Sequence, residues 1–274
     1  MIDPTAFPGL DKAVAGKTIV VKLGGSVGQD DTVPEDSTYL QSLGAQVVLV
    51  HGGGPAITDW LDRMGKQTHF VHGLRYTDDE TLDVVRMVLS GLVNGEIVAR
   101  LGQAGARAVG LSGADDSLLV ASVRDRRVGL VGEVTGANPA PIQALAGLGY
   151  IVVVSPVAVD GKGGFLNVNA DTAAVEIAVA LSAERLVFLT DVPGIKGADG
   201  TVAGRLVPDE ARAWITSGVI NGGMIPKVEA CIRALAGTRG AQIVDGRQPH
   251  VLLAALVGAE VVGTTLVAGV SARS

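Results

Sequence analysis

Short apolar runs and amphipathic stretches alternate along the chain. Six runs rich in β-branched and aliphatic residues predict strands, at residues 18–23, 46–50, 107–111, 150–154, 185–189 and 241–244. Between these runs, apolar residues recur with the spacing of one helix face. Such alternation is typical of parallel strands that are joined by crossover helices. The pattern therefore predicts a fold of the α/β class.

The same pattern predicts helices and one hairpin. The residues that mark the first two helices are Trp60, Leu61 and Met64, then Leu82, Val85, Leu89 and Val93, and the second helix is the longer. Residues 138–148 and 173–181 predict two further helices. Two apolar runs flank the charged residues 125–127, so residues 118–134 predict a hairpin that lies over the sheet.

The composition fits one large or two modest globular domains and disfavours some partners. With 274 residues, 47% of them apolar, the chain can bury a sizeable core. Its formal charge of -6 comes without a basic run, whereas a nucleic-acid-binding face needs clustered Lys and Arg. We therefore expect no nucleic-acid partner. The single cysteine, Cys231, falls on the apolar side of a predicted helix and is expected to pack in the core.

No membrane or export segment is expected. The stretch between Glu133 and Asp160 carries no charge, but Pro139, Pro141 and Pro156 would break a helix in lipid. The N-terminal segment lacks the charged region and apolar run of a secretory signal. A cytoplasmic location is the resulting expectation.

Two glycine-rich segments directly follow predicted strands. KLGGS covers residues 22–26 and HGGGP covers residues 51–55. The N–H groups of such loops can point at phosphate oxygens, and the Lys22 ammonium can reach the same anion. Two plainer explanations stay open: the glycines allow tight strand-to-helix packing, and Lys22 extends to water. His51 is expected to be a packed or hydrogen-bonded residue rather than a base.

Two further segments carry candidate polar residues. In GLRYTD, residues 73–78, Arg75 suits bidentate recognition of a carboxylate, although a surface ion pair is the simpler explanation. In NVNADTAA, residues 167–174, Asn169 can cap a helix that has Asp171 in its first turn. By itself that is ordinary capping chemistry.

The last two segments lie in the C-terminal part of the chain. TDVPGI, residues 190–195, follows a predicted strand, and ligands collect at the carboxyl ends of parallel strands. In GGMIPK, residues 222–227, Pro226 fits the first turn of a helix and puts Lys227 beside the positive helix end. A lysine there is unfavourable unless an anion joins it, which favours a functional role.

These six segments, in this order and at these separations, resemble the motifs of the amino acid kinase family, and within it the branch that phosphorylates N-acetyl-L-glutamate. The resemblance runs from about Gly16 to the C-terminus. It implies an ATP-dependent enzyme that phosphorylates the side-chain carboxylate of N-acetyl-L-glutamate to N-acetyl-L-glutamyl 5-phosphate in arginine biosynthesis. It also implies an open, mainly parallel twisted sheet between helices. The implied parts are a lead segment at residues 1–16, an amino-acid-substrate lobe at 17–165 and an ATP-binding lobe at 166–274.

The family motifs imply a role for each matching residue. Lys22 and Lys227 would stabilise the transferring phosphoryl group from opposite sides, and Asp171 would hold both lysines in position. Arg75 would grip the substrate α-carboxylate, and Asn167 would bind the substrate amide.

Glycines and two later segments complete the implied site. The glycines that would supply N–H groups are Gly24 and Gly25 on the nucleotide side, and Gly53 and Gly54 on the substrate side. The nucleotide would rest against Asp191, Val192, Pro193, Gly194, Ile195 and Lys196, and against Val219, Ile220 and Asn221. Mg²⁺ would arrive on the ATP phosphates, without dedicated protein ligands.

Three other functions are alternatives. A kinase for aminoadipate or glutamate bound to a carrier protein tends to have extra residues before the arginine loop, and NxDGD and GMxRK where this chain has NVNAD and GMIPK. A catalytically silent amino-acid sensor would keep the fold, but both candidate lysines and Asp171 are present. A nucleotide-binding oxidoreductase is disfavoured because no GxGxxG opens the first crossover.

A few positions depart from the usual pattern of this branch. Ala114, Asp116 and Ser117 stand where members often have a lysine and two glycines, and Gly95 stands where lysine is common. These loops lie away from the presumed chemistry, so fine specificity is affected more than activity.

The resemblance also bears on assembly. Arginine-inhibited members usually have a longer N-terminal helix that builds a hexamer, together with KYGG or KFGG. This chain has KLGGS and a short lead segment with Pro4 and Pro8, so we expect an arginine-insensitive homodimer. The ending DGRQPHVLLAAL is similar to the arginine-responsive forms, and a hexamer therefore stays an alternative.

Overall fold

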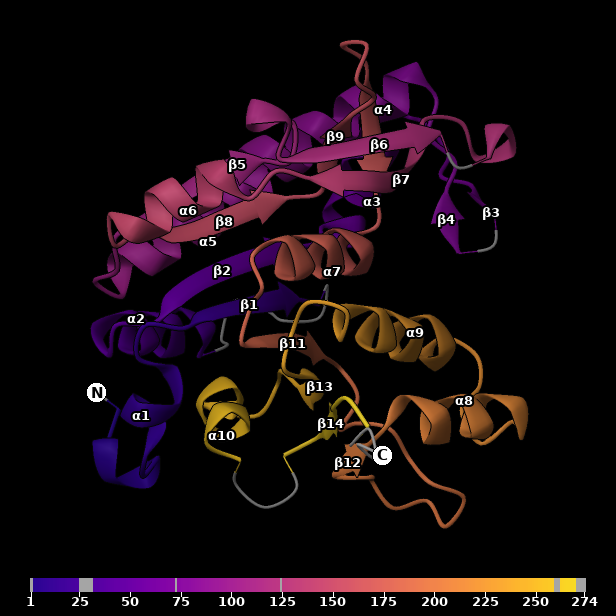
Figure 1. Ribbon diagram of the computed structural model, residues 1–274. Coiled ribbons are helices and arrows are strands. Elements are labelled where there is room, and N and C mark those ends of the chain that lie inside the picture. The colour runs from indigo at the N-terminus through magenta and orange to yellow at the C-terminus, as the bar shows by residue number, and fades with distance from the viewer. Residues whose placement is uncertain (1, 25–31, 72, 124, 259–261, 270–274) are drawn as a thin grey trace.

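A computed structural model describes residues 2–24, 32–71, 73–123, 125–258 and 262–269 (Figure 1). Within these residues, the centre is an eight-stranded sheet in the order β12-β14-β13-β11-β1-β2-β8-β5. Its strands are β1 Thr18–Leu23, β2 Gln46–His51, β5 Ala108–Ser112, β8 Ile151–Ser155, β11 Arg185–Thr190, β12 Arg205–Leu206, β13 Ala241–Asp245 and β14 Thr264–Leu266. Neighbours are parallel except β13 and β14. All six predicted strands lie in this sheet, which confirms the predicted α/β class.

Helices cover both faces of the sheet. Their bounds are α1 Leu10–Val14, α2 Val33–Ser42, α3 Gly54–Arg63, α4 Asp79–Arg86, α5 Asn94–Gln103, α6 Ala140–Gly147, α7 Ala170–Ala180, α8 Pro208–Thr216, α9 Met224–Ala234 and α10 Val251–Val257. Helices α6, α7 and α9 pack on one face, and α2, α5 and α10 pack on the other (Figure 1). The strands are therefore apolar on both sides, as buried parallel strands are.

Strand β1 shows how one strand serves both faces. Val20 packs in the core that contains residues of α7 and α9, whereas Ile19 and Val21 pack in the core that contains residues of α10. Side chains alternate along a strand, so Lys22 points to the same face as Val20. The strand period therefore turns Lys22 toward α7.

A second, four-stranded sheet has the order β10-β7-β6-β9, and β9 also pairs with β10. Its strands are β6 Leu119–Val123, β7 Val131–Ala137, β9 Val157–Val159 and β10 Phe165–Val168. Strands β6 and β7 are antiparallel, which confirms the predicted hairpin. The β9–β10 hairpin and the two-residue strands β3 Phe70–Val71 and β4 Leu74–Arg75 were not predicted, because such short strands have too few residues for a pattern.

The predicted long helix is present but is not uniform. Helix α4 continues without a break into a π-helical segment, Met87–Val93, and then into α5. Asp78 caps α4 by accepting a hydrogen bond from Thr81 N. A π-helical turn leaves no mark in an apolar repeat, so the sequence pattern could not reveal it.

The remaining elements complete the layers. Short 3₁₀ turns occur at Pro4–Ala6, Asp115–Ser117 and Arg126–Val128. Cys231 is fully buried on α9, and burial raises the pKa of its thiol, which confirms that it is a core residue. Within the described residues, no helix has the length and apolar character that crossing a membrane requires.

The halves of the chain contribute to opposite ends of one sheet. Strands β1, β2, β8 and β5 come from the first part, and β11, β13, β14 and β12 come from the last part. They join where β1 pairs with β11, and α7 packs on β1 and β2. The predicted lobe boundary falls at the start of β10.

Residues 116 and 117, two of the positions that depart from the pattern of the resembling branch, have an unusual backbone. Asp116 and Ser117 have φ angles of 48° and 52°, in the left-handed region that favours glycine. The positions where glycine is common in the resembling branch are therefore glycine-like in conformation here as well. Both side chains are exposed, so no packing is lost if Cβ is removed.

Ser117→Gly is expected to raise the free energy of unfolding by about 0.5 kcal/mol. Removing Cβ relieves about 1 kcal/mol of left-handed strain, while the flexibility of glycine costs about 0.5 kcal/mol. Urea denaturation of the purified variant measures the change. The matched control is Ser122→Gly on β6, which is exposed and not left-handed and should lose stability instead.

Candidate active site

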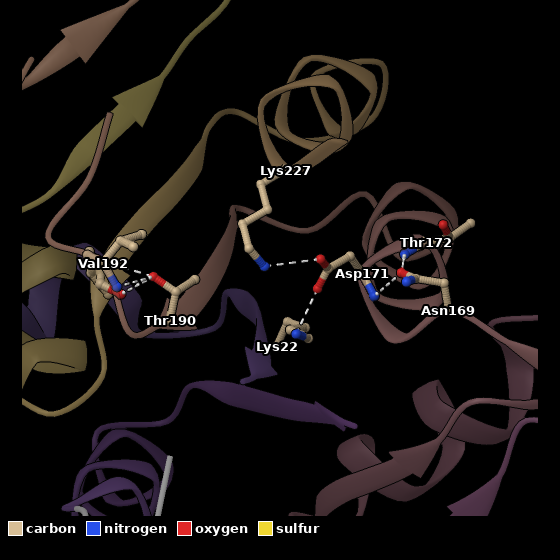
Figure 2. A network of polar contacts seen from close by, with 8 residues as sticks. Lys22, Asn169, Asp171, Thr172, Thr190, Val192 and Lys227 are labelled. Carbon is tan, nitrogen blue, oxygen red and sulfur yellow. Dashed lines mark hydrogen bonds and ion pairs between the residues drawn. The ribbon is translucent and has the colours of Figure 1, made fainter. Parts of the chain in front are cut away.

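Three charged side chains meet at the carboxyl end of β1 (Figure 2). Lys22 Nζ lies 2.7 Å from Asp171 Oδ1, and Lys227 Nζ lies 3.3 Å from Asp171 Oδ2. The side chains come from β1, α7 and α9, and are 10%, 18% and 25% exposed for Lys22, Asp171 and Lys227. We call these three residues the lysine–aspartate cluster.

Local structure positions each member of the cluster. Asn169 caps α7, accepting hydrogen bonds from Asp171 N at 2.9 Å and Thr172 N at 3.2 Å, as predicted. This puts Asp171 in the first turn, where the helix dipole favours a carboxylate. Helix α9 begins at Met224, so Lys227 also lies near a positive helix end. The Asp171 carboxylate offsets that unfavourable position.

The electrostatics of the cluster leave a surplus of positive charge. Burial alone would raise the pKa of Asp171, but the charges and hydrogen bonds of Lys22 and Lys227 outweigh it and lower that pKa. Asp171 is therefore ionised at neutral pH, and two ammonium groups share one carboxylate. The cluster is suited to an anion whose oxygens can contact both ammonium groups.

The two glycine segments lie beside this cluster. Gly24 N donates to Leu189 O at 2.9 Å, so its N–H is already engaged and Gly24 contributes close backbone approach instead. Gly25 lies outside the described residues. Gly52 lies next to the start of α7, since a Cβ built on Gly52 would be 4.0 Å from Ala170 Cβ. Gly53 and Gly54 form the N-terminal end of α3, where the first N–H groups have no partner inside the helix.

His51 anchors the HGGGP segment and is buried, as predicted. Its Nδ1 lies 2.7 Å from Gly52 O, and its Nε2 lies 3.1 Å from Asn94 Nδ2. Burial lowers the pKa of His51. The neutral ring therefore donates from Nδ1 and accepts at Nε2. Asn94, which also donates to Val153 O at 3.1 Å, was not recognised from the sequence because its partners are remote in the chain.

Arg75 is buried rather than paired at the surface, so the simpler expectation for it was wrong. Its Nη2 donates to Gly54 O at 2.9 Å and Thr58 Oγ1 at 2.8 Å, and its Nη1 donates to Thr68 Oγ1 at 3.1 Å. Burial lowers its pKa, although an arginine stays protonated at neutral pH. Among the described residues, no carboxylate forms an ion pair with Arg75. A buried cation held by neutral oxygens can accept a carboxylate ligand.

Asn167 lies on β10, four residues before Asp171. Its Nδ2 donates to Thr77 Oγ1 at 3.1 Å. Thr77 also bonds the backbone of Arg75, so one hydrogen-bonded chain connects the two predicted substrate residues. Thr77 stands in the GLRYTD segment, but nothing in the sequence indicated this contact.

The predicted nucleotide segments come together around one cavity of about 280 Å³. The residues that line it are Val192, Pro193, Gly194, Ile195, Lys196, Val219, Ile220, Asn221 and Met224. Asp191 is exposed and is not among them. The cavity is mainly apolar, with Lys196 and Asn221 as polar side chains.

Hydrogen bonds from neighbouring strands hold this loop. Thr190 Oγ1 lies 3.2 Å from Val192 N and 3.2 Å from Val244 O (Figure 2 shows Thr190 and Val192). Ile195 N donates to Thr264 Oγ1 at 2.8 Å. Thr264 was missed because its strand, β14, has only three residues. Among the described residues, no group of three or more His, Cys, Asp and Glu side chains could hold a metal ion.

Gly24→Ala is expected to lower the free energy of unfolding by about 2 kcal/mol. A Cβ at this position would lie 2.6 Å from Leu189 O, and backbone cannot move aside as a side chain can. Chemical denaturation measures the loss. Gly54→Ala is the control, because a Cβ there meets nothing within 4 Å, and it should change stability by less than about 0.5 kcal/mol. Equal losses would contradict the close approach of Gly24 to β11.

Comparison with known proteins gives consistent relatives. The profile described as the amino acid kinase family matches residues 17–245. Acetylglutamate kinase from Nostoc sp. strain PCC 7120 is 51% identical over 249 residues, covering 87% of this chain and 84% of that protein. Acetylglutamate kinase from Methanoculleus marisnigri is 48% identical over 269 residues, covering 92% of this chain and 93% of that protein.

Solved structures share the fold at lower identity. N-acetylglutamate synthase from Neisseria gonorrhoeae, complexed with coenzyme A and N-acetyl-glutamate, has a TM-score of 0.86 at 24% identity. The match covers 98% of this chain and 65% of that longer chain. Carbamate kinase from Giardia lamblia bound to AMP-PNP has a TM-score of 0.71 at 18% identity, covering 93% of this chain and 99% of that chain. These similarities concern the fold alone.

Proposed function

The chain belongs to the amino acid kinase family, and we propose that it transfers the γ-phosphoryl group of ATP to the side-chain carboxylate of N-acetyl-L-glutamate. The product is N-acetyl-L-glutamyl 5-phosphate, an acyl phosphate for arginine biosynthesis. The observation that carries this proposal is the lysine–aspartate cluster, in which two ammonium groups share one carboxylate beside the glycine segments. The relatives named acetylglutamate kinase support the choice of substrate.

The lysine–aspartate cluster supplies charge and positioning for phosphoryl transfer. Lys22 and Lys227 contact the transferring phosphoryl group from opposite sides, and Asp171 holds both ammonium groups at the distances observed. Phosphoryl transfer asks little covalent chemistry of the protein, so fixed positive charge is its main contribution. The attacking carboxylate is ionised at neutral pH and needs no base.

The amino-acid substrate binds between the HGGGP segment and the four-stranded sheet that contains β10. Arg75 takes the α-carboxylate as the missing counterion of its buried guanidinium. Asn167 binds the amide, and Gly53 and Gly54 direct the N-terminal end of α3 at the reacting carboxylate. The substrate lobe comprises residues 17–165.

The nucleotide binds in the cavity that residues 192–196 and 219–221 line, within an ATP lobe of residues 166–274. Asp191 borders this loop, and Gly24 lies on the phosphate side. Mg²⁺ is carried on the nucleotide, where it neutralises phosphate charge. Asp171 is already engaged by two lysines, which fits a metal bound through phosphates rather than through a protein cage.

An ADP-release assay tests the proposed function. Purified protein is incubated with ATP, Mg²⁺ and one acceptor: N-acetyl-L-glutamate, N-acetyl-L-aspartate, L-glutamate or L-2-aminoadipate. We expect ADP release to be fastest with N-acetyl-L-glutamate, with hydroxylamine trapping the acyl phosphate product. Absence of acceptor-dependent ADP release, or preference for an unacetylated acceptor, would contradict the proposal.

Lys22→Ala and Lys227→Ala are each expected to lower kcat by about 10²-fold or more. Each removes a positive charge from the phosphoryl group in the transition state, and such losses cost about 3 kcal/mol. The assay is the same ADP release at saturating substrates. Lys162→Ala is the control, because Lys162 is exposed in the β9–β10 turn and should keep wild-type kcat. Unchanged turnover in either cluster variant would refute its role.

The enzyme acts in the cytoplasm as a homodimer. Met87 and Leu92 of the π-helical segment are 60% and 40% exposed, which is consistent with a contact between copies along this helix. Light scattering is expected to give twice the 27.8 kDa mass of the chain. A sixfold mass would instead support the hexamer, and a single mass would exclude both.

A further inference from the structure

We propose that Thr77 is a positioning residue that turns the Asn167 carboxamide so that its oxygen faces the substrate, which makes the site select an acceptor with an amide N–H. The inference rests on the proposed function. It adds a residue that neither the sequence motifs nor the comparisons single out, and it specifies which end of Asn167 contacts the ligand.

The direction of the hydrogen bonds around Thr77 carries this inference. Thr77 is fully buried, and its Oγ1 lies 2.9 Å from Arg75 O and 3.1 Å from Asn167 Nδ2. The Arg75 carbonyl can only accept, so the single hydroxyl proton of Thr77 goes to it. Oγ1 then has only lone pairs left for Asn167, and a lone pair requires a donor. The amide nitrogen of Asn167 must therefore face Thr77.

The carboxamide oxygen of Asn167 consequently points away from Thr77. Leu166 and Val168, its neighbours on β10, are buried in the core that contains residues of α7 and α9. Asn167 therefore lies on the opposite face of the strand. Asn167 is only half-buried, which leaves its oxygen accessible to a ligand. The hydrogen-bonded chain from Arg75 through Thr77 to Asn167 thus ends in an acceptor at the substrate side.

Backbone contacts keep Thr77 and Asn167 in register. Leu130 bonds both residues: its N–H donates to Thr77 O at 2.6 Å, and its carbonyl accepts from Asn167 N at 2.9 Å. Thr77 N also donates to Val128 O at 3.0 Å. Gly129, at φ +73°, allows this approach, because a Cβ there would collide with Thr77 O. The hydroxyl therefore stays within reach of Asn167 and can set its orientation.

A fixed hydrogen-bond acceptor on Asn167 discriminates between two otherwise similar substrates. The acetamido N–H of N-acetyl-L-glutamate can donate to Asn167 Oδ1. In the ester analogue, 2-acetoxyglutarate, an oxygen replaces that nitrogen, and two acceptors then face each other without a proton. Sites that are built for a hydrogen bond reject analogues that lack the donor, because the buried polar group is left unpaired.

The test measures kcat/KM for the amide and the ester by ADP release, and compares their ratio between variants. We expect wild-type enzyme to prefer the amide by about 10²-fold, consistent with loss of one buried hydrogen-bond donor. Thr77→Val keeps the shape but removes the hydroxyl, so Asn167 can rotate and the ratio should fall about 10-fold. Thr77→Ser restores the hydroxyl and should restore the ratio. Thr135→Val, whose hydroxyl donates to Val120 O at the surface, is the control and should keep the wild-type ratio.

Several outcomes would overturn the inference. A ratio in Thr77→Val within about twofold of wild type excludes orientation by the hydroxyl, and so does a Thr77→Ser variant that loses as much as Thr77→Val. If Thr77→Val does not fold, Asn167→Ala tests the same acceptor, since this half-buried side chain can be truncated. It should also lose the preference, and an unchanged ratio there overturns the inference. A wild-type enzyme that is inactive on the amide would instead overturn the proposed function.

Discussion

The contact of Asp171 with two lysines is the interaction on which the site geometry depends. Each of the three side chains comes from a different element, β1, α7 and α9, and each is mostly buried. Removing one partner of a buried ion pair leaves an uncompensated charge and costs about 3–5 kcal/mol. The cluster therefore constrains how α7 and α9 can lie on β1, in addition to collecting charge at one point.

The strands and loops around the lysine–aspartate cluster keep it accessible to a ligand. Parallel strands end at the same edge, so β1, β2 and β11 bring Gly24, HGGGP and TDVPGI together there. Buried neutral groups then fix the polar side chains: His51 is held by Asn94, and Arg75 by Gly54, Thr58 and Thr68. The contacts of His51 hold the HGGGP segment in place, whereas those of Arg75 leave its positive charge without a carboxylate among the described residues, as an anion site requires.

The sequence was informative where a few neighbouring residues determine the structure. Buried parallel strands need continuous apolar runs, and the cap of α7 needs only Asn169 and the next residues, so both were predicted correctly. The sequence failed where the partner is remote in the chain. Thr77 and Thr264 act through single hydroxyl groups, and nothing in their local sequence reveals a partner on another element. The buried setting of Arg75 likewise depends on α3, which the GLRYTD motif does not contain.

The strand order has a consequence for the way the chain assembles during synthesis. β1 is made almost first, yet one of its two neighbours, β11, begins only at Arg185. A growing chain therefore carries an apolar strand with one unpaired edge until most of the protein has emerged, and such edges recruit other chains. Lys227 lies on α9, which follows β11 in the chain, so a nascent chain completes the charged centre only after the partner strand of β1 has been made.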